Sequence, residues 1–198
     1  KEITGITFSG YTVPYDKSVH TIEISGTLPT GVTVEYYLGE DVFEGAINAG
    51  TYVITAKFTD STGNYQVPED MNATLTITKI DPEYTVPTGL TGTYGNNVST
   101  VTLPSGWTYD DPDQVLDNIE GVEANVTFTP EDTTNYNTIN TTVTITVEQA
   151  SISGINFDSV TVEYSGDTHT ISITGELPSG VTVKYYLGEE EVEGAINA

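Results

Sequence analysis

The two histidines are the first side chains to consider for chemistry, since an imidazole can act as a general base or bind a metal ion. His20 and His169 fall at equivalent places in two copies of a repeated block, each at the start of an expected strand. A general base or a metal site needs partner groups within reach, and neither histidine has a set of candidate ligands near it in the sequence. A structural role is therefore the favoured interpretation of both.

Two clusters of carboxylates come next, because Ca²⁺ prefers oxygen ligands. They are Asp110, Asp111 and Asp113 in the middle of the chain and Glu189, Glu190 and Glu191 near its end. Neither cluster has the ligand spacing of a dedicated calcium loop of about 12 residues. We interpret both as solvated acidic loops, and calcium binding stays open as the alternative.

Enzymatic chemistry finds little support in the residue pattern. The chain has no cysteine for a thiolate zinc site, no glycine-rich phosphate loop and no serine or threonine paired with a base. A glycosidase needs two carboxylates at a set separation in space, which the sequence does not give. We therefore expect a protein that is not an enzyme, with no catalytic residue, no cofactor and no metal centre.

Tyrosine is the remaining candidate, with 13 copies in the chain. In VEYYL and VKYYL, consecutive tyrosines must face opposite sides of a strand. Tyr36 and Tyr185 fall on the inward parity, and Tyr37 and Tyr186 fall on the outward one. An outward aromatic ring flanked by threonines could stack on a sugar, which makes Tyr37 and Tyr186 the candidate ligand-stacking residues. The favoured alternative is that each ring covers a neighbouring strand or a joint between domains.

Net charge narrows the choice of partners. The chain has 29 acidic residues against five lysines and no arginine, giving a formal net charge of −24. Nucleic-acid binding needs a basic footprint that displaces counterions from phosphate, and an anionic membrane surface repels such a chain. No run of about 18 apolar residues is present, so no membrane insertion is expected. The expected partners are neighbouring repeats or copies of the same chain, with a glycan or protein as candidate ligand.

An internal repeat organises the elements that would position these residues. Residues 152–198 repeat residues 3–49 without a gap, and 29 of the 47 aligned positions are identical. The offset between the copies is 149 residues, which is too long for one solenoid unit and suits two small domains. The stretch between them carries a divergent form of the same pattern, with LPSGWTY at the place of LPTGVTV.

Apolar and polar residues alternate almost throughout, which is the period of β-strands. Turn signals such as Leu28-Pro29-Thr30-Gly31 separate short alternating runs, and no amphipathic helical stretch of three turns is present. Short strands at about ten-residue spacing predict an all-β sandwich or small barrel. The expected inward-facing residues are Val32, Val34, Tyr36, Leu38, Tyr52, Ile54, Ala56, Phe58, Ala73, Leu75, Ile77, Val101, Leu103, Trp107, Ala124, Val126, Phe128, Val143, Ile145 and Val147.

Three domains in the order A–B–A′ follow from the repeat. Residues 1–80 form repeat type A, residues 81–149 a divergent type B, and residues 150–198 the N-terminal part of a second type A repeat. The linkers at 78–82 and 148–150 are short, so we expect a semi-rigid rod. The last copy has no counterpart of residues 50–78. Strands from a longer natural chain, or strands from another chain by β-augmentation, would complete it.

Several motifs carry a family resemblance. VPYDKSVHTI, LPTGVTVEYY, NAGTYVITAKFTD and ATLTITK resemble the tandem MBG/YDG-type repeats of large bacterial surface proteins, and TYGNNVSTVTLPSGWTYDDP with FTPEDTTNY resembles a second repeat that alternates with them. The resemblance implies a secreted, surface-displayed array of Ig-like β-sandwich domains in an adhesin or a stalk. The family's YDG becomes Tyr15-Asp16-Lys17 in the first copy and Tyr164-Ser165-Gly166 in the last, and we expect the same turn in both.

Two functions from different classes remain. The first is a non-catalytic, extracellular stalk segment of a surface protein or filament, which predicts stiff joints between domains. The alternative is an adhesin module that binds a host or matrix glycan or protein, which predicts a shared exposed patch on both type A copies. We favour the first. The identity of any ligand, the length of the parent chain and the source organism do not follow from the sequence.

Overall fold

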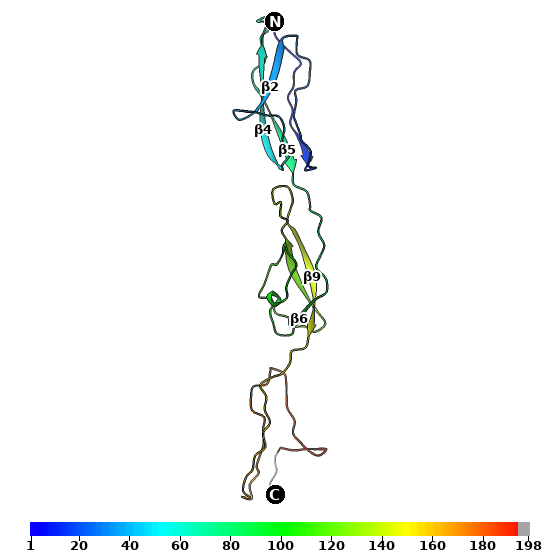
Figure 1. Cartoon of the computed structure of the whole chain (residues 1–198), viewed down its shortest axis with the longest axis vertical. Coiled ribbons are helices and arrows are strands. Elements are labelled where there is room, and N and C mark those ends of the chain that lie inside the picture. Colours follow the sequence, from blue (N-terminus) through cyan, green and yellow to red (C-terminus); the bar gives the residue numbers. More distant parts are fainter. Residues whose placement is uncertain (194–198) are drawn as a thin grey trace.

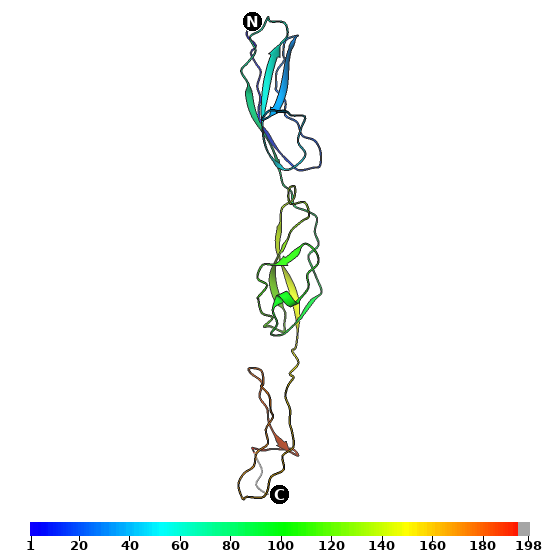
Figure 2. The ribbon, with the colours of Figure 1, turned by 60° about the vertical axis from the view of Figure 1, so that its left-hand side comes forward.

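The computed structural model describes residues 1–193 as an all-β chain drawn out along one axis (Figures 1 and 2). Three parts follow one another along this axis: the first segment (residues 1–80), the second segment (residues 81–149) and the third segment (residues 150–193). Residues 194–198, which belong to the expected last copy, lie outside the described residues. Within residues 1–193, no helix has the length and apolar character needed to cross a membrane.

The first segment is built on a five-stranded sheet with the order β1-β5-β4-β2-β3. In this sheet β1 runs parallel to β5, and the other neighbouring strands are antiparallel. Extended chain covers one face of the sheet and is joined by isolated backbone bridges rather than by long ladders. The strands are β1 (Tyr11–Pro14), β2 (Val32–Leu38), β3 (Asp41–Val42), β4 (Gly50–Asp60) and β5 (Met71–Thr78).

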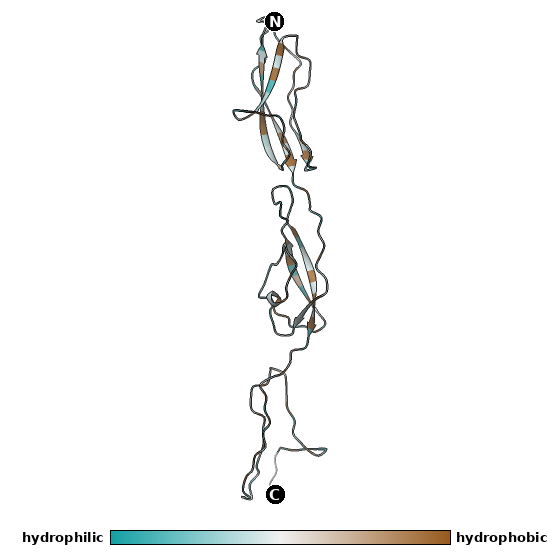
Figure 3. Cartoon of the chain, in the orientation of Figure 1, coloured by the Kyte–Doolittle hydropathy of each residue, from teal (hydrophilic) through white to brown (hydrophobic). Residues whose placement is uncertain are grey.

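The core of the first segment follows the alternation of its strands. Ile54, Ala56 and Phe58 of β4 are buried, and between them Thr55 is half-buried and Lys57 is exposed. Burial of a large apolar side chain stabilises a fold by about 1.5–3 kcal/mol. Leu38 is the exception to the expected inward set: it is exposed, because it ends β2 at the tight turn into β3. Figure 3 shows the resulting apolar bands along the strands.

The second segment repeats this plan with four strands in the order β6-β9-β8-β7, and β6 runs parallel to β9. The order matches β1-β5-β4-β2 of the first segment. Trp107 is buried as expected and lies 5.2 Å from the ring of Phe128. One 3-10 turn, η1 (Val98–Thr100), precedes β7. The strands are β6 (Leu90–Thr93), β7 (Trp107–Tyr109), β8 (Val122–Phe128) and β9 (Ile139–Glu148).

The third segment has much less regular structure than the other two. Its described residues form one short hairpin, β10 (Tyr186–Leu187) and β11 (Glu190–Glu191), and one backbone bridge between Asn156 and Thr174. Apolar side chains that correspond to core positions of the first segment are exposed here, and none of the buried clusters among the described residues includes a residue of this segment.

Candidate functional site

The histidines of the two copies have different partners. His20 Nε2 lies 2.8 Å from Asp16 Oδ1, and the same carboxylate oxygen accepts a hydrogen bond from the backbone N–H of Ser18 at 2.8 Å. The hydrogen bond from Ser18 and the contact with His20 lower the pKa of Asp16. In the third segment Ser165 Oγ replaces the carboxylate, 2.9 Å from His169 Nε2. A carboxylate in one copy and a hydroxyl in the other give the two copies no common catalytic pair.

The turn before each histidine is the same in both copies. Lys17 has a φ of 70°, and among the described residues it is the only one other than glycine with a positive φ. Gly166 takes the equivalent place with a φ of 83°. The left-handed conformation suits glycine and strains other residues. The chain therefore makes the expected turn in the first copy even though lysine stands where glycine would fit better.

The acidic clusters are engaged in local contacts. Asp110 Oδ1 accepts a hydrogen bond from Thr127 Oγ1 at 2.6 Å, and Asp111 Oδ1 accepts one from the backbone N–H of Asp113 at 3.2 Å. Glu191 lies 3.0 Å from Lys184 Nζ. No group of three or more His, Asp or Glu residues within 1–193 lies close enough to hold a metal ion.

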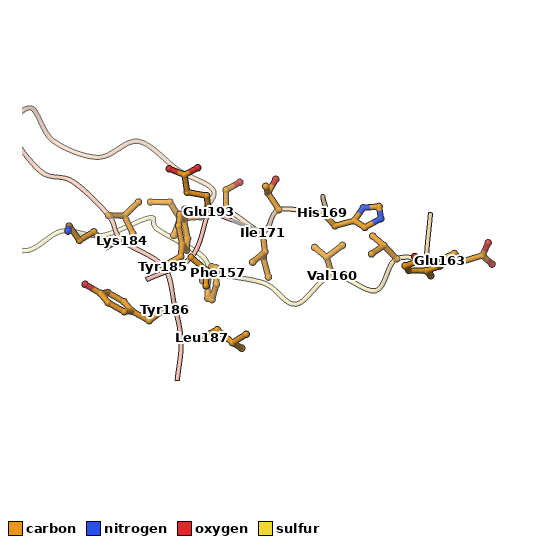
Figure 4. A pocket seen from close by; sticks show the side chains of 17 residues that line it. Phe157, Val160, Glu163, His169, Ile171, Lys184, Tyr185, Tyr186, Leu187 and Glu193 are labelled. Atoms are coloured by element: carbon orange, nitrogen blue, oxygen red, sulfur yellow. Dashed lines mark hydrogen bonds between the residues drawn. The ribbon is translucent and has the colours of Figure 1, made fainter. Parts of the chain in front are cut away.

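The two outward tyrosines have different surroundings. The Tyr37 hydroxyl donates a hydrogen bond to Glu35 Oε2 at 2.8 Å, which raises the pKa of Tyr37, and Lys57 Nζ lies 4.9 Å from the centre of its ring. A cation over the ring face is a favourable contact that already uses this face. Tyr186 is 57% exposed. Figure 4 shows its ring pointing away from the neighbouring apolar side chains.

The backbone closes the joint between the first and second segments. Ile80 lies in the linker, and its N–H donates to the carbonyl of Asn135 at 3.1 Å. The N–H of Asn137 donates back to the carbonyl of Ile80 at 2.9 Å, which forms a parallel bridge. Lys79 Nζ donates to the carbonyl of Thr133 at 2.6 Å. The linker is therefore fixed on a loop of the second segment.

The side chain of Asn135 extends this joint into the first segment. Asn135 is 4% exposed and is the one buried polar residue of the described chain. Its Oδ1 accepts a hydrogen bond from the backbone N–H of Ala49 at 2.7 Å, and its Nδ2 donates to Asn48 Oδ1 at 3.1 Å. Nδ2 also donates to Asp132 Oδ2 at 2.8 Å, and this is the main reason why the pKa of Asp132 is lowered.

An aromatic contact completes the joint. The ring of Tyr136 meets the ring of Tyr15 edge to face, with centres 5.6 Å apart and an angle of 86° between the planes. Tyr15 is 9% exposed as a result, and Ile80 packs on the same buried cluster. Sequence reasoning missed this site. The signal was the Asn-Tyr pair, which recurs at Asn64-Tyr65 and Asn135-Tyr136 in the two corresponding loops.

The same kind of loop lies at the outer end of the first segment. Asn64 accepts a hydrogen bond on its carbonyl from the amino group of Lys1 at 2.8 Å, and Gln66 donates its N–H to the carbonyl of Lys1 at 2.9 Å. These contacts repeat those of Asn135 and Asn137 with Ile80. The loop between β4 and β5 and the corresponding loop between β8 and β9 thus each form backbone hydrogen bonds with the chain where their segment begins.

The joint between the second and third segments lacks this element. Tyr94 donates its N–H to the carbonyl of Glu148 at 2.8 Å, just as Tyr15 donates to Thr78 at 2.9 Å. Tyr94 is nevertheless 47% exposed, and Ile119 beside this end is 56% exposed. Within the described residues, the third segment supplies no loop that covers them as Tyr136 covers Tyr15.

An apolar groove with a volume of about 700 Å³ runs along the third segment (Figure 4). Phe157, Val160, Val162, Val183 and Tyr185 are among the residues that line it. Val183, Tyr185 and Leu187, which correspond to Val34, Tyr36 and Leu38 of β2, all line this groove, and Leu187 is 72% exposed.

Comparison with known proteins adds little to this geometry. No protein-family model matches the chain, and no curated protein matches it. Among solved structures, the chain is similar to the crystal structure of Drosophila N-cadherin EC1-4, with 12% sequence identity and a TM-score of 0.32. The match covers 75% of this chain and 50% of that chain, so it spans half the length of the cadherin fragment. At this TM-score the likeness assigns neither a fold family nor a function to the chain.

Proposed function

We propose that the chain is a structural spacer: a non-catalytic stalk segment of an extracellular surface protein or filament, built as a tandem array of small Ig-like β-sandwich domains. The observation that carries the proposal is the closed joint between the first and second segments, where Asn135 is buried against two residues of the first segment. A spacer has to keep its two ends apart, and a joint of this kind limits bending at the linker.

The energetics of the joint support stiffness. A hydrogen bond contributes about 0.5–1.5 kcal/mol net, and a buried polar group left without a partner costs about 1–3 kcal/mol. Opening the joint would expose Asn135, leave the Ala49 N–H to find water, and separate the rings of Tyr15 and Tyr136. An edge-to-face ring pair adds about 0.5–1.5 kcal/mol. Bending by disengagement is therefore costly on the scale of thermal energy.

The adhesin alternative has weaker support. It requires a patch that both type A copies share, but the ring face of Tyr37 is occupied by Lys57 and the hydroxyl of Tyr37 by Glu35. Tyr186 is exposed in a different setting. The extracellular location is supported by the family resemblance and by the shortage of trypsin sites, since residues 81–149 contain no lysine or arginine.

Spin-label distance measurements test the proposal directly. The chain has no cysteine, so cysteines introduced at exposed Thr33 in β2 and exposed Thr144 in β9 carry the only labels. A spacer predicts a narrow distance distribution for this pair, and Asn135→Ala should broaden it because the joint loses its buried amide.

A second label pair in the same chain provides the matched control. Thr144 and Ser172 lie on either side of the joint between the second and third segments, and both are exposed. Their distance distribution should be broader, because no equivalent of Asn135 closes that joint in the described residues. If the Thr33–Thr144 distribution is as broad as the Thr144–Ser172 distribution, the chain is not a stiff spacer at its closed joint.

A further inference from the structure

The third segment reproduces one half of the first segment. Phe8 and Tyr36 lie 5.7 Å apart with their rings at 32°, and Phe157 and Tyr185 lie 5.8 Å apart with their rings at 30°. In both copies the tyrosine hydroxyl accepts a hydrogen bond from the backbone N–H twelve residues before it, at 2.9 and 3.0 Å. A backbone bridge joins the equivalent pairs 7–25 and 156–174. The third segment therefore adopts these contacts although its described residues contain no counterpart of β4 and β5.

The first segment shows what fills the corresponding space. Its sheet has the order β1-β5-β4-β2, so β5 and β4 lie between β1 and β2. The positions equivalent to β1 and β2 in the third segment are residues 160–163 and 181–187. Residues of both ranges line the apolar groove: Val160 and Val162 from the first, and Val183 and Tyr185 from the second. Figure 4 labels Val160 and Tyr185 among them. No strand of the described residues lies in it.

We propose that this groove is a docking site for a β-hairpin with the chemistry of β4 and β5, that is, two antiparallel strands with the apolar alternation of residues 50–78. An apolar small molecule or a lipid would fill the volume, but it would leave unpaired the backbone groups of residues 182–184, which belong to no strand and have no backbone partner among the described residues. Strand addition satisfies both the apolar face and the open backbone edge.

The first segment also fixes the register of the occupant on the side of residues 181–187. In the first segment Val34 is opposite Phe58, and Tyr36 is opposite Ala56. The third-segment equivalents are Val183 and Tyr185. The first docked strand should therefore run antiparallel to residues 181–187, with its Phe58-type ring beside Val183.

The register on the other side follows from the parallel pair. Leu75 of β5 is opposite Tyr11 of β1, and Ile77 is opposite Val13. The equivalents of Tyr11 and Val13 are Val160 and Val162, which are 60% and 51% exposed. The second docked strand should run parallel to residues 160–163.

A second observation, outside the groove, points to the same occupant. In the hairpin of the first segment the loop between the strands carries Asn64 and Tyr65, and the corresponding loop of the second segment carries Asn135 and Tyr136. Tyr136 covers Tyr15 at the closed joint. A hairpin docked on the third segment would bring such a loop to Tyr94 and Ile119, the exposed pair at the end of the second segment. One occupant thus accounts for both exposed apolar surfaces.

The test uses the full chain and a synthetic peptide with the sequence of residues 50–80. Binding is measured by fluorescence anisotropy of the labelled peptide, and hydrogen exchange with mass spectrometry locates the protected amides. We expect binding at one site per chain, with new protection at residues 157–187. Appending residues 50–80 to the C-terminus of the chain through a flexible linker gives the same test at high effective concentration.

Three variants define the site. Val183→Asp in the chain should weaken binding by at least about 10-fold, because docking would bury an unpaired carboxylate. Leu75→Asp in the peptide should do the same. Tyr94→Ala should weaken binding by about 2- to 13-fold, the equivalent of one lost aromatic contact. Tyr94 lies outside the groove, so its effect distinguishes a hairpin with a loop from an isolated strand.

The contrary outcomes are distinct. Protection at residues 8–38 instead of 157–187 would mean that the peptide exchanges into the first segment, and this overturns the proposal. Self-association of the chain that protects residues 157–187 and excludes the peptide assigns the groove to a second copy, which also overturns it. Absence of new protection in the covalently extended chain overturns it independently of peptide affinity. None of these results bears on the closed joint or on the spacer role.

Discussion

Asn135→Ala tests whether one buried amide closes the joint between the first and second segments. The wild-type side chain makes three hydrogen bonds, to the Ala49 N–H, Asn48 Oδ1 and Asp132 Oδ2. Alanine leaves the Ala49 N–H without its partner, at a cost of about 1–3 kcal/mol, and removes two further bonds of about 0.5–1.5 kcal/mol each. Water can enter a joint at the surface and offset part of this. We expect a loss of about 2–3 kcal/mol.

The single tryptophan makes the assay specific to one side of the joint. Trp107 is buried in the second segment, so its fluorescence during urea unfolding reports on that segment alone. Asn135→Ala should lower the free energy of unfolding measured at Trp107. Asn48→Ala, a change in the first segment, should lower it by about 0.5–1.5 kcal/mol, because it removes one bond across the joint.

Thr33→Ala is the matched control, since Thr33 is an exposed residue of the first segment and should leave the Trp107 signal unchanged. The reasoning fails if Asn48→Ala behaves like Thr33→Ala. In that case the amide stabilises its own loop, and the two segments unfold without a coupling at this joint.

Three further predictions concern charge, strain and cleavage. The pKa of Asp132 is lower in the folded chain than its ordinary value of about 3.9. This carboxylate therefore stabilises the fold above that pH, and its contribution is lost as the pH falls through the folded-state pKa. Unfolding monitored at Trp107 should show this loss of stability, and the Asp132→Asn variant should not show it. Lys17→Gly should stabilise the first segment by about 0.5–1 kcal/mol, because it relieves the strain of a left-handed lysine but adds conformational freedom to the unfolded chain. Slower hydrogen exchange in β4 and β5 would show this gain in stability, whereas faster exchange would contradict the claim that Lys17 is strained. Trypsin should cut the native chain first after Lys184, which is exposed beside the open groove. Mass spectrometry of early digests identifies the first cut, and a first cut after Lys57 in the middle of β4 would contradict this order.

The strand cores could be predicted from the sequence because their signal is local. Alternation with a period of two places Ile54, Ala56 and Phe58 on one face whatever the rest of the chain does, and the structure buries all three. The outward parity of Tyr37 was predicted in the same way. To predict that Lys57 lies over the ring of Tyr37, one needs the register of β2 against β4, in which Glu35 is opposite Lys57. The sequence of a single strand does not contain that register.

The joint could not be predicted, because its contacts join residues far apart in the chain. Asn135 is 86 residues from its partner Ala49, and both lie in loops, where no periodicity applies. The contact between Asp16 and His20 was missed for a related reason: it joins residues four apart in a turn, and the familiar rule for that spacing describes helices. The recurrence of Asn-Tyr in two loops was visible, but its meaning depends on which ends of the segments meet.

The parallel pairing of β1 with β5, and of β6 with β9, has a consequence for a chain under tension. In each sheet the strand near the entry of the segment lies beside the strand at its exit, in the same direction. A pull on the two ends of the molecule therefore draws these partners past each other along their length, and it loads the whole row of backbone hydrogen bonds at once instead of opening them one by one. Such a ladder yields only when all its bonds fail together, at a rate set by the barrier to unfolding. The third segment, whose described residues contain no such ladder, would lengthen first, and the length it releases would lower the tension in the whole chain at a given extension.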